Sequence, residues 1–206
     1  MIGRDTQVSG ATTIGVVFDI GVILASEKRV MYGNLIMSEQ GRKVFKITES
    51  IGAACAGSFS DMQNLMRNLR SKAFIFELEA HRPISVRSVS RLLSNMLSEQ
   101  RDSFVAEVLV GGVDDQGAFL FFIDSLGSVI SDKYFAVGSG ASLALGVIER
   151  GFHEGIAFKE AKHLVLKSLK SAARRDVMSG TSIDMLIITK NGIQEESLDL
   201  DLYSRI

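Results

Sequence analysis

Residues 12–18, Thr-Thr-Ile-Gly-Val-Val-Phe, decide the fold class because β-branched and aromatic side chains dominate them. After the turn Asp19-Ile20-Gly21, a second apolar run covers residues 22–25, and the two runs together predict a β-hairpin. Residues 43–47 and 51–56 repeat the strand-like pattern. We therefore expect these runs to form a first antiparallel sheet in the opening quarter of the chain.

The hydrophobic period changes after this region. Between residues 61 and 79 the apolar side chains recur at helical spacing, and Ser60 or Asp61 is the expected helix cap. Pro83 interrupts the pattern, and Ser85 opens a second helix that extends to about Leu97. Two consecutive helices thus follow the first strands.

Strand and helix patterns then recur in the second half of the chain. Residues 104–111, 118–123 and 134–137 predict a second sheet, residues 142–150 and 158–174 predict helices, residues 182–189 predict a last strand, and the acidic tail at 194–206 is ambiguous. Because strands and helices come in blocks, a parallel doubly wound sheet is disfavoured. We predict an α+β fold in which two antiparallel sheets form a sandwich with helices outside.

The charge and hydropathy of the chain restrict its partners. The 206 residues include 23 basic and 24 acidic side chains, a net charge of −1, which gives no basis for binding nucleic acid or an anionic membrane. The mean hydropathy is +0.21, yet the longest uncharged stretch, residues 134–148, is shorter than the ~20 apolar residues of a membrane span. With a single cysteine and no signal-peptide pattern, we expect a cytoplasmic protein.

The familiar motifs of cofactor and metal sites do not occur in the sequence. The glycine clusters at residues 111–112 and 138–140 match neither of the phosphate-binding patterns. His81, His153 and His163 lack metal-ligand spacing, and Cys55 has no basic neighbour to stabilise a thiolate. We therefore expect no cofactor and no metal.

Nine short segments, in their order and with their intervals, resemble a proteasome β subunit of the archaeal kind over nearly the whole chain. They are residues 11–15, 21–29, 33–36, 42–44, 56–58, 84–86, 109–112, 138–140 and 175–180. The resemblance implies the N-terminal nucleophile hydrolase fold, a four-layer αββα sandwich. It also implies a threonine-type endopeptidase complex that degrades unfolded polypeptides.

In that family a propeptide is removed by self-cleavage after a glycine. The exposed threonine then attacks peptide carbonyls through its hydroxyl, with its own amine as proton acceptor. The resemblance places the cleavage between Gly10 and Ala11. It therefore implies a propeptide at residues 1–10 and a single β-type domain at residues 11–206.

The resemblance also assigns roles to the residues around the nucleophile. Lys43 matches the lysine beside the threonine hydroxyl, and Glu27 stands where the family usually has the aspartate that pairs with this lysine. Ser139, Asp176 and Ser179 match the group that orients the amine, and the Gly57 amide matches the oxyanion donor. The matching substrate-pocket positions are occupied by Val30, Phe45, Cys55 and Phe59.

The departure from the family lies at the nucleophile itself, where Ala11 replaces threonine and has no hydroxyl to attack with. Replacement by Thr12 would require a register shift that turns each strand side chain to the opposite face. Two explanations remain open: a natural paralogue with a structural or assembly role and no activity in any form, or an engineered precursor trap of an active subunit. In both cases we expect this chain to be inactive.

The resemblance further implies the partners. They are other β subunits in a seven-membered homomeric or heteromeric ring, an α-subunit ring, and a regulatory ATPase that acts through the α ring. An α-type subunit and the dodecameric bacterial relative are disfavoured, the latter because residues 175–180 have the proteasome form of that loop.

Overall fold

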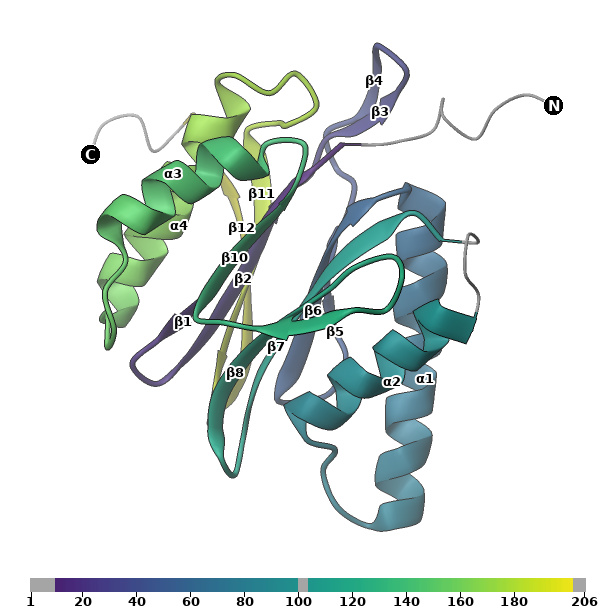
Figure 1. Ribbon diagram of the computed structural model, residues 1–206. Helices are drawn as coiled ribbons and strands as arrows, with labels where there is room; N and C mark the ends of the chain where they lie inside the picture. Colours follow the sequence, from purple (N-terminus) through teal and green to yellow (C-terminus); the bar gives the residue numbers. More distant parts are fainter. Residues whose placement is uncertain (1–9, 100–103, 202–206) are drawn as a thin grey trace, which may run out of the picture.

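Two five-stranded antiparallel sheets lie face to face, and a pair of helices covers the outer face of each (Figure 1). This computed structural model describes residues 10–99 and 104–201. Apart from Gly10, the expected propeptide lies outside the described residues, as does the end of the tail at residues 202–206. The expected α+β sandwich with its four layers is confirmed.

The first sheet has the strand order β10-β1-β2-β11-β12. Its strands are β1 (Thr12–Phe18), β2 (Gly21–Glu27), β10 (Tyr134–Gly138), β11 (Ser182–Thr189) and β12 (Gly192–Asp199). The predicted β1–β2 hairpin is present, with Phe18 opposite Gly21. Residues 194–199 of the ambiguous tail belong to strand β12, which pairs with β11 along its whole length.

The second sheet has the order β5-β6-β7-β8-β9. Its strands are β5 (Val44–Lys46), β6 (Ile51–Gly57), β7 (Ala106–Asp114), β8 (Gly117–Ile123) and β9 (Val129–Ser131). A separate hairpin of β3 (Val30–Tyr32) and β4 (Leu35–Ser38) follows β2 and stands out from the body of the molecule (Figure 1).

The expected division of strands between the sheets was wrong. Residues 43–47 and 51–56 do not join the first hairpin, because β6 pairs with β7 instead. Strand β10, expected in the second sheet, pairs with β1. Local pattern predicts strands but not their partners, since the pairing is set by contacts between segments far apart in the chain.

The helices are α1 (Phe59–Ala80), α2 (Val86–Glu99), α3 (Ala141–Gly151) and α4 (Phe158–Ala173). The expected cap of α1 was wrong, since Ser58 is the N-cap residue and its side chain makes no capping hydrogen bond. Asp61 instead accepts a hydrogen bond from the Val105 amide at 3.1 Å, which ties the first turn to the start of β7. None of the helices in the described residues is long and apolar enough to cross a membrane.

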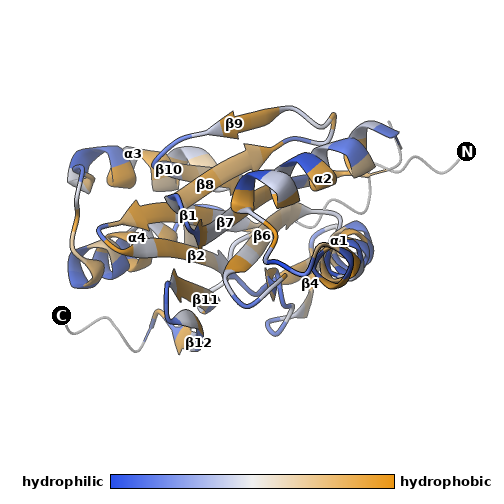
Figure 2. Cartoon of the chain, turned by 90° about the horizontal axis from the view of Figure 1, so that it is seen from below, coloured by the Kyte–Doolittle hydropathy of each residue, from blue (hydrophilic) through white to orange (hydrophobic). Residues whose placement is uncertain are grey.

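Three apolar clusters fill the spaces between the layers. One lies between the second sheet and α1 and α2, one between the first sheet and α3 and α4, and the third between the two sheets. Figure 2 shows the apolar strands inside and the polar faces of the helices outside. At Gly15 the sheets approach so closely that a Cβ atom would lie 2.7 Å from Leu120. Both faces of each sheet are thus buried, which accounts for the high hydropathy.

Candidate functional site

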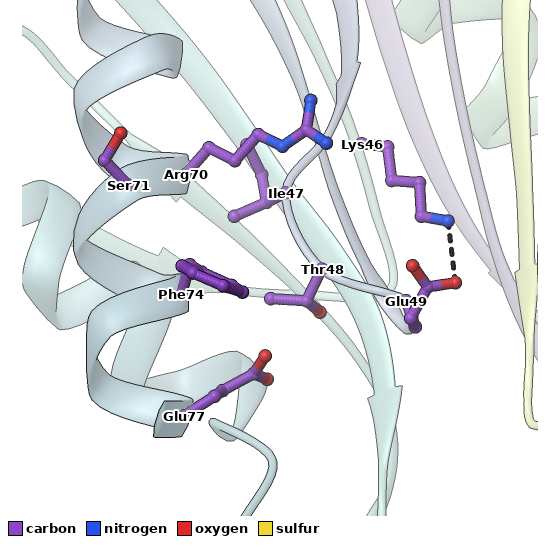
Figure 3. Close-up of a pocket in the computed structure, with 8 residues that line it drawn as sticks. All are labelled: Lys46, Ile47, Thr48, Glu49, Arg70, Ser71, Phe74 and Glu77. Carbon is purple, nitrogen blue, oxygen red and sulfur yellow. Dashed lines mark hydrogen bonds and ion pairs between the residues drawn. The ribbon is translucent and has the colours of Figure 1, made fainter. Parts of the chain in front are cut away.

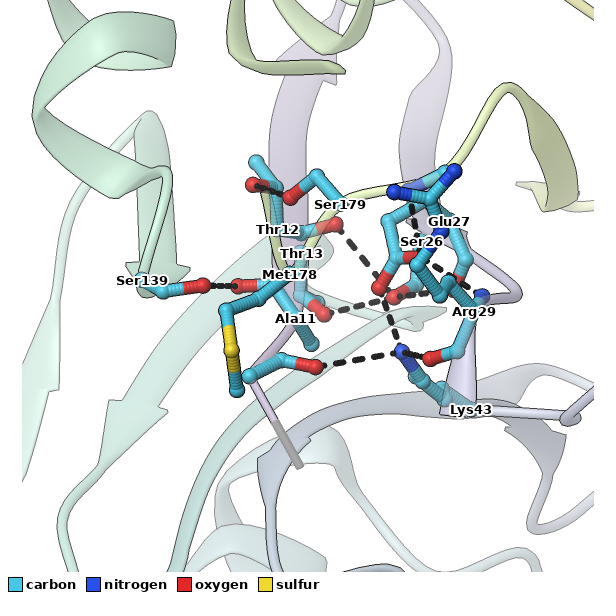
Figure 4. A network of polar contacts seen from close by, with 12 residues as sticks. Ala11, Thr12, Thr13, Ser26, Glu27, Arg29, Lys43, Ser139, Met178 and Ser179 are labelled. Atoms are coloured by element: carbon cyan, nitrogen blue, oxygen red, sulfur yellow. Dashed lines mark hydrogen bonds and ion pairs between the residues drawn. The ribbon is translucent and has the colours of Figure 1, made fainter. Parts of the chain in front are cut away.

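Most of the residues assigned by the resemblance meet at one end of the sandwich, where β1 begins (Figure 4). Ala11 lies directly before β1 and is fully buried. Glu27 is the last residue of β2, and Lys43 immediately precedes β5. Ser139 follows β10, while Asp176 and Ser179 lie in the loop between α4 and β11. Five separate segments of the chain therefore converge on the start of the first strand.

Glu27 and Lys43 form a buried ion pair, with side-chain exposures of 1% and 0%. The Lys43 ammonium also donates to the carbonyl oxygens of Arg29 at 2.5 Å and Gly10 at 3.4 Å. The second carboxylate oxygen of Glu27 accepts hydrogen bonds from the amides of Arg29 at 2.6 Å and Gly180 at 2.9 Å. The extra methylene of glutamate is thus accommodated, and the charges of the pair are surrounded by hydrogen-bonding partners.

Burial determines the electrostatics of this pair. It raises the pKa of Glu27, against the opposing effect of the Lys43 charge and of the hydrogen bonds that the carboxylate accepts. Burial likewise lowers the pKa of Lys43, against the opposing charge of Glu27. A lysine with a lowered pKa releases and accepts a proton more readily near neutral pH, which suits it to assist proton transfer.

A second polar cluster centres on Asp176. Its Oδ2 atom lies 2.7 Å from the hydroxyl oxygens of both Ser139 and Ser179. The Ser179 hydroxyl is in turn 2.7 Å from the Thr12 hydroxyl, and the Ser139 hydroxyl is 3.3 Å from the Ala11 carbonyl oxygen. These contacts form a chain of hydroxyl groups and a carboxylate along which protons can move.

The peptide between Gly10 and Ala11 lies between the two clusters. The Gly10 carbonyl is in contact with Lys43, and the Ala11 carbonyl is in contact with Ser139. A Cβ atom on Gly10 would lie 2.4 Å from the Cβ of Met178 and 2.7 Å from the Ser139 hydroxyl. Packing alone therefore requires glycine at this position.

The hydroxyl groups next to Ala11 in the sequence have other partners. Thr12 faces Ser179, whereas Thr13 donates to the Cys55 carbonyl at 2.9 Å and lies 2.8 Å from the Ser26 hydroxyl. In the described part of the chain, neither threonine hydroxyl contacts Lys43. Ala11, which the resemblance predicts to be at the nucleophile position, has only a methyl group as its side chain.

Gly57 is the last residue of β6, and only the N-cap residue Ser58 separates it from α1. Its φ of +128° is a conformation that only glycine adopts readily, and a Cβ atom there would lie 2.2 Å from the Val105 carbonyl oxygen. Both observations require glycine at this position. The role of its amide as an oxyanion donor stays a prediction.

The four expected pocket residues come together in part. Val30 and Phe59 both flank Gly41, where a Cβ atom would lie 2.2 Å and 3.2 Å from them. Cys55 is fully buried in the core cluster against which Phe45 and Phe59 pack. Burial raises the pKa of the Cys55 thiol, so this side chain is an inert apolar group.

Sequence reasoning missed the contributions of Arg29, Gly180 and Met178. The first two act on the ion pair through main-chain groups, and Met178 acts by packing on Gly10. The Arg29 side chain also joins Glu39 at 3.0 Å to the Val177 carbonyl at 2.9 Å. All three lie within segments that carry the resemblance, but main-chain hydrogen bonding leaves no signal in residue type.

The residues present support acid–base and acyl-transfer chemistry at a backbone carbonyl. The described residues contain no group of three or more histidine, cysteine or acidic side chains arranged to hold a metal ion. The site combines a lysine of lowered pKa, a hydroxyl–carboxylate chain and a peptide carbonyl in contact with the lysine.

Comparison with known proteins finds proteasome subunits, both by family and by individual relatives. The protein family "Proteasome subunit" matches residues 8–188. "Proteasome subunit beta 2" of Caldivirga maquilingensis is 45% identical over 92% of this chain and 95% of its own, and that of Pyrobaculum arsenaticum is 45% identical over 98% and 99%. "Proteasome subunit beta 1" of Cenarchaeum symbiosum is 44% identical over 90% and 96%. Relatives numbered 1 and 2 are thus almost equally similar to the chain.

Proposed function

The chain belongs to the archaeal type of proteasome β subunit, in a family of threonine endopeptidases, and from this premise we propose that it is a non-catalytic subunit of the core particle. It contributes chamber wall and ring contacts but no peptide hydrolysis of its own. The observation that carries the proposal is that residue 11 is a fully buried alanine, whose carbonyl accepts from Ser139 and whose preceding carbonyl, that of Gly10, accepts from Lys43.

The surrounding residues retain the roles that the family implies. Lys43, held by Glu27, would favour deprotonation of a hydroxyl at position 11 and polarise the Gly10 carbonyl, 3.4 Å from its ammonium. Ser139, Asp176 and Ser179 would orient a free amine at residue 11 and carry its proton, and the Gly57 amide would stabilise the oxyanion. The substrate pocket is proposed to involve Val30, Phe45, Cys55 and Phe59, which favours apolar side chains.

Without a hydroxyl at position 11, the peptide between Gly10 and Ala11 has no internal attacker. We therefore propose that residues 1–10 stay attached as an unprocessed propeptide in this chain. The partners that follow are neighbouring β subunits in a seven-membered ring, the α ring and, through it, a regulatory ATPase. The proposed substrates of the assembled particle are unfolded polypeptides, cut at the sites of an active sister subunit.

The experiment compares the chain with Ala11→Thr and with Ala11→Val, which has nearly the shape of threonine but no hydroxyl. Intact mass reports cleavage after Gly10, and a fluorogenic peptide with an apolar cleavage-site residue reports hydrolysis by the assembled particle. We expect Ala11→Thr alone to lose residues 1–10 and to hydrolyse the peptide. The wild-type chain and Ala11→Val remain full length and inactive.

Two results have distinct meanings. Hydrolysis by the wild-type chain that an inhibitor directed at N-terminal threonine blocks would overturn the proposal. If Ala11→Thr is neither cleaved nor active while it folds like Ala11→Val, the residues around position 11 no longer support catalysis by a threonine there. The chain would then be a structural paralogue in any form.

A further inference from the structure

A cavity at the far end of β1 is not accounted for by the candidate site. Its volume is about 650 Å³, and it is lined by the end of β1, the residues around the β7–β8 turn, the residue before β10 and the α3–α4 connection. The candidate site lies where β1 begins and this cavity where β1 ends, so about 20 Å of strand separates them (Figure 1). We call it the β1-end cavity.

The rim of the β1-end cavity carries three exposed charged side chains, those of Lys133, Asp19 and Glu154. Among residues 10–99 and 104–201, none of the three takes part in an ion pair. The Asp19 carboxylate accepts a hydrogen bond from the neighbouring Ile20 amide at 2.9 Å. The cavity thus offers one ammonium group and two carboxylates to a ligand.

Main-chain hydrogen bonds place the positive and the negative groups at successive points along β1. The Val17 amide donates to the Lys133 carbonyl at 2.8 Å, and the Asp19 amide donates to the Ile156 carbonyl at 3.0 Å. Lys133 therefore lies beside residue 17, whereas the connection that contains Glu154 lies beside residue 19. Two strand residues span about 7 Å, and so does an extended dipeptide. The main-chain spacing of the charged residues thus matches the distance between the two termini of a short peptide.

The walls between the charged groups are apolar. Val17 and the rings of Phe119 and Phe152 line the cavity. Phe152 packs against Tyr134 with ring centroids 4.9 Å apart, and Phe119 stacks on Phe121 at 6.3 Å, so neighbouring rings hold both in place. An apolar side chain of a ligand would bury surface against them. The volume lies within the roughly 300–1,000 Å³ that is typical of small-ligand sites.

The cavity along α1, drawn in Figure 3, does not combine the same groups. Its lysine is already paired, since Lys46 lies 2.7 Å from the Glu49 carboxylate. Glu77 accepts a hydrogen bond from the Ile84 amide at 3.1 Å, which ties α1 to the segment before α2. Arg70 leaves an excess of positive charge there. A ligand with one positive and one negative terminus therefore fits the β1-end cavity better.

We propose that the β1-end cavity binds short peptides whose two termini are both free. Lys133 pairs with the terminal carboxylate, Asp19 and Glu154 pair with the terminal ammonium group, and an apolar side chain lies against Phe119 and Phe152. Hydrolysis of a polypeptide at two bonds yields such peptides, so this ligand class is a product of an endopeptidase complex. The inference goes beyond the proposed function, because it requires no hydrolysis by this chain.

The test is isothermal titration calorimetry of the full-length chain with three ligands: the dipeptide Leu-Phe, N-acetyl-Leu-Phe and Leu-Phe amide. Each blocked peptide lacks one terminal charge and keeps both apolar side chains. The titrations are made at low salt, because salt screens exposed charges. We expect the wild-type chain to bind Leu-Phe at one site and each blocked peptide about fivefold more weakly, the effect of one exposed ion pair.

Variants of the charged residues identify which group recognises which terminus. In Lys133→Gln, amidation of the peptide should no longer weaken binding, whereas acetylation still should. In Asp19→Asn/Glu154→Gln the dependence should be reversed, because the lost partner is that of the ammonium group. Two control variants, which should keep the wild-type preference for Leu-Phe, make the same changes in net charge at exposed positions outside the cavity: Arg70→Gln and Glu79→Gln/Glu149→Gln.

Three results overturn the proposal: no binding of Leu-Phe at millimolar concentrations, equal affinity for the three peptides, or charge variants that keep the wild-type preference. Equal affinity would indicate a surface for internal segments of a polypeptide instead. Circular dichroism on every variant verifies that the fold is intact. The mass and hydrolysis assays on Ala11→Thr judge the proposed function separately, so either proposal can fail while the other stands.

Discussion

Replacement of Lys43 by methionine tests whether the buried pair determines the stability of the site. Methionine keeps most of the apolar volume of lysine but leaves Glu27, whose side chain is 1% exposed, without its cation. The carboxylate then retains its hydrogen bonds from the Arg29 and Gly180 amides. The variant must either bury an unpaired charge or protonate Glu27.

Protonation of Glu27 sets an upper limit on the free energy of unfolding that the variant loses. From the ordinary pKa of 4.5 for a glutamate, holding the proton at pH 7 costs about 3.4 kcal/mol, at about 1.36 kcal/mol per pH unit. At pH 5 the same cost is about 0.7 kcal/mol. We therefore expect Lys43→Met to lower the free energy of unfolding by about 3 kcal/mol at pH 7 and by much less at pH 5.

The direction in which the stability deficit of Lys43→Met changes with pH follows from the direction of the pKa change of Glu27. A glutamate whose folded pKa is raised adds stability that is fully present below its unfolded pKa and is lost as the pH rises through the folded pKa. Burial already raises the pKa of Glu27 in the wild-type chain, and removal of Lys43 raises it further. The deficit of the variant therefore grows with pH above the wild-type folded pKa.

Urea unfolding followed by far-ultraviolet circular dichroism measures these free energies, because the chain has no tryptophan for fluorescence. The protein concentration is kept low and constant, since self-association would add apparent stability. Lys46→Met is the control: its partner Glu49 is 92% exposed, so the loss should stay within about 1 kcal/mol. An equal deficit for Lys43→Met at pH 5 and pH 7 would refute the reasoning.

Two further predictions concern packing. Gly10→Ala should destabilise the fold by about 1–3 kcal/mol in thermal unfolding, because the new Cβ atom would lie 2.4 Å from the Met178 Cβ. Met178→Gly should restore part of this loss, whereas Met178→Ala, which keeps the Cβ, should not; equal rescue by both would contradict the packing argument. Cys55, fully buried with a raised pKa, should resist a thiol reagent such as iodoacetamide until urea unfolds the chain. Rapid modification of the native protein would show that the core opens at β6.

The sequence predicted the elements better than their arrangement. The strand at residues 12–18 and the helix at residues 158–174 carry strong periodic patterns, and the structure has both within a residue. The pattern did not reveal β9, the β3–β4 hairpin or the pairing of β6 with β7. Short strands carry too few side chains to establish a period, and strand pairing depends on segments distant in the chain.

The site shows the same division. The family resemblance predicted roles for Glu27, Lys43, Ser139, Asp176 and Ser179, and the structure brings the first two together as an ion pair and the last three together by hydrogen bonds. The main-chain groups that complete the ion pair come from Arg29 and Gly180, and no residue-level pattern encodes a backbone hydrogen bond.

By itself, the sequence determined the α+β class and the family resemblance, which predicts that Ala11 occupies the nucleophile position, since each depends on side-chain type and order along the chain. Only the tertiary structure decided that the Gly10 and Ala11 carbonyls contact Lys43 and Ser139, and that Glu27 fits its longer side chain between two backbone amides. Two of those contacts, Ser139 to Ala11 and Gly180 to Glu27, join residues more than a hundred positions apart, and the pairing of β1 with β10 and of β2 with β11 in the first sheet brings them within hydrogen-bonding distance.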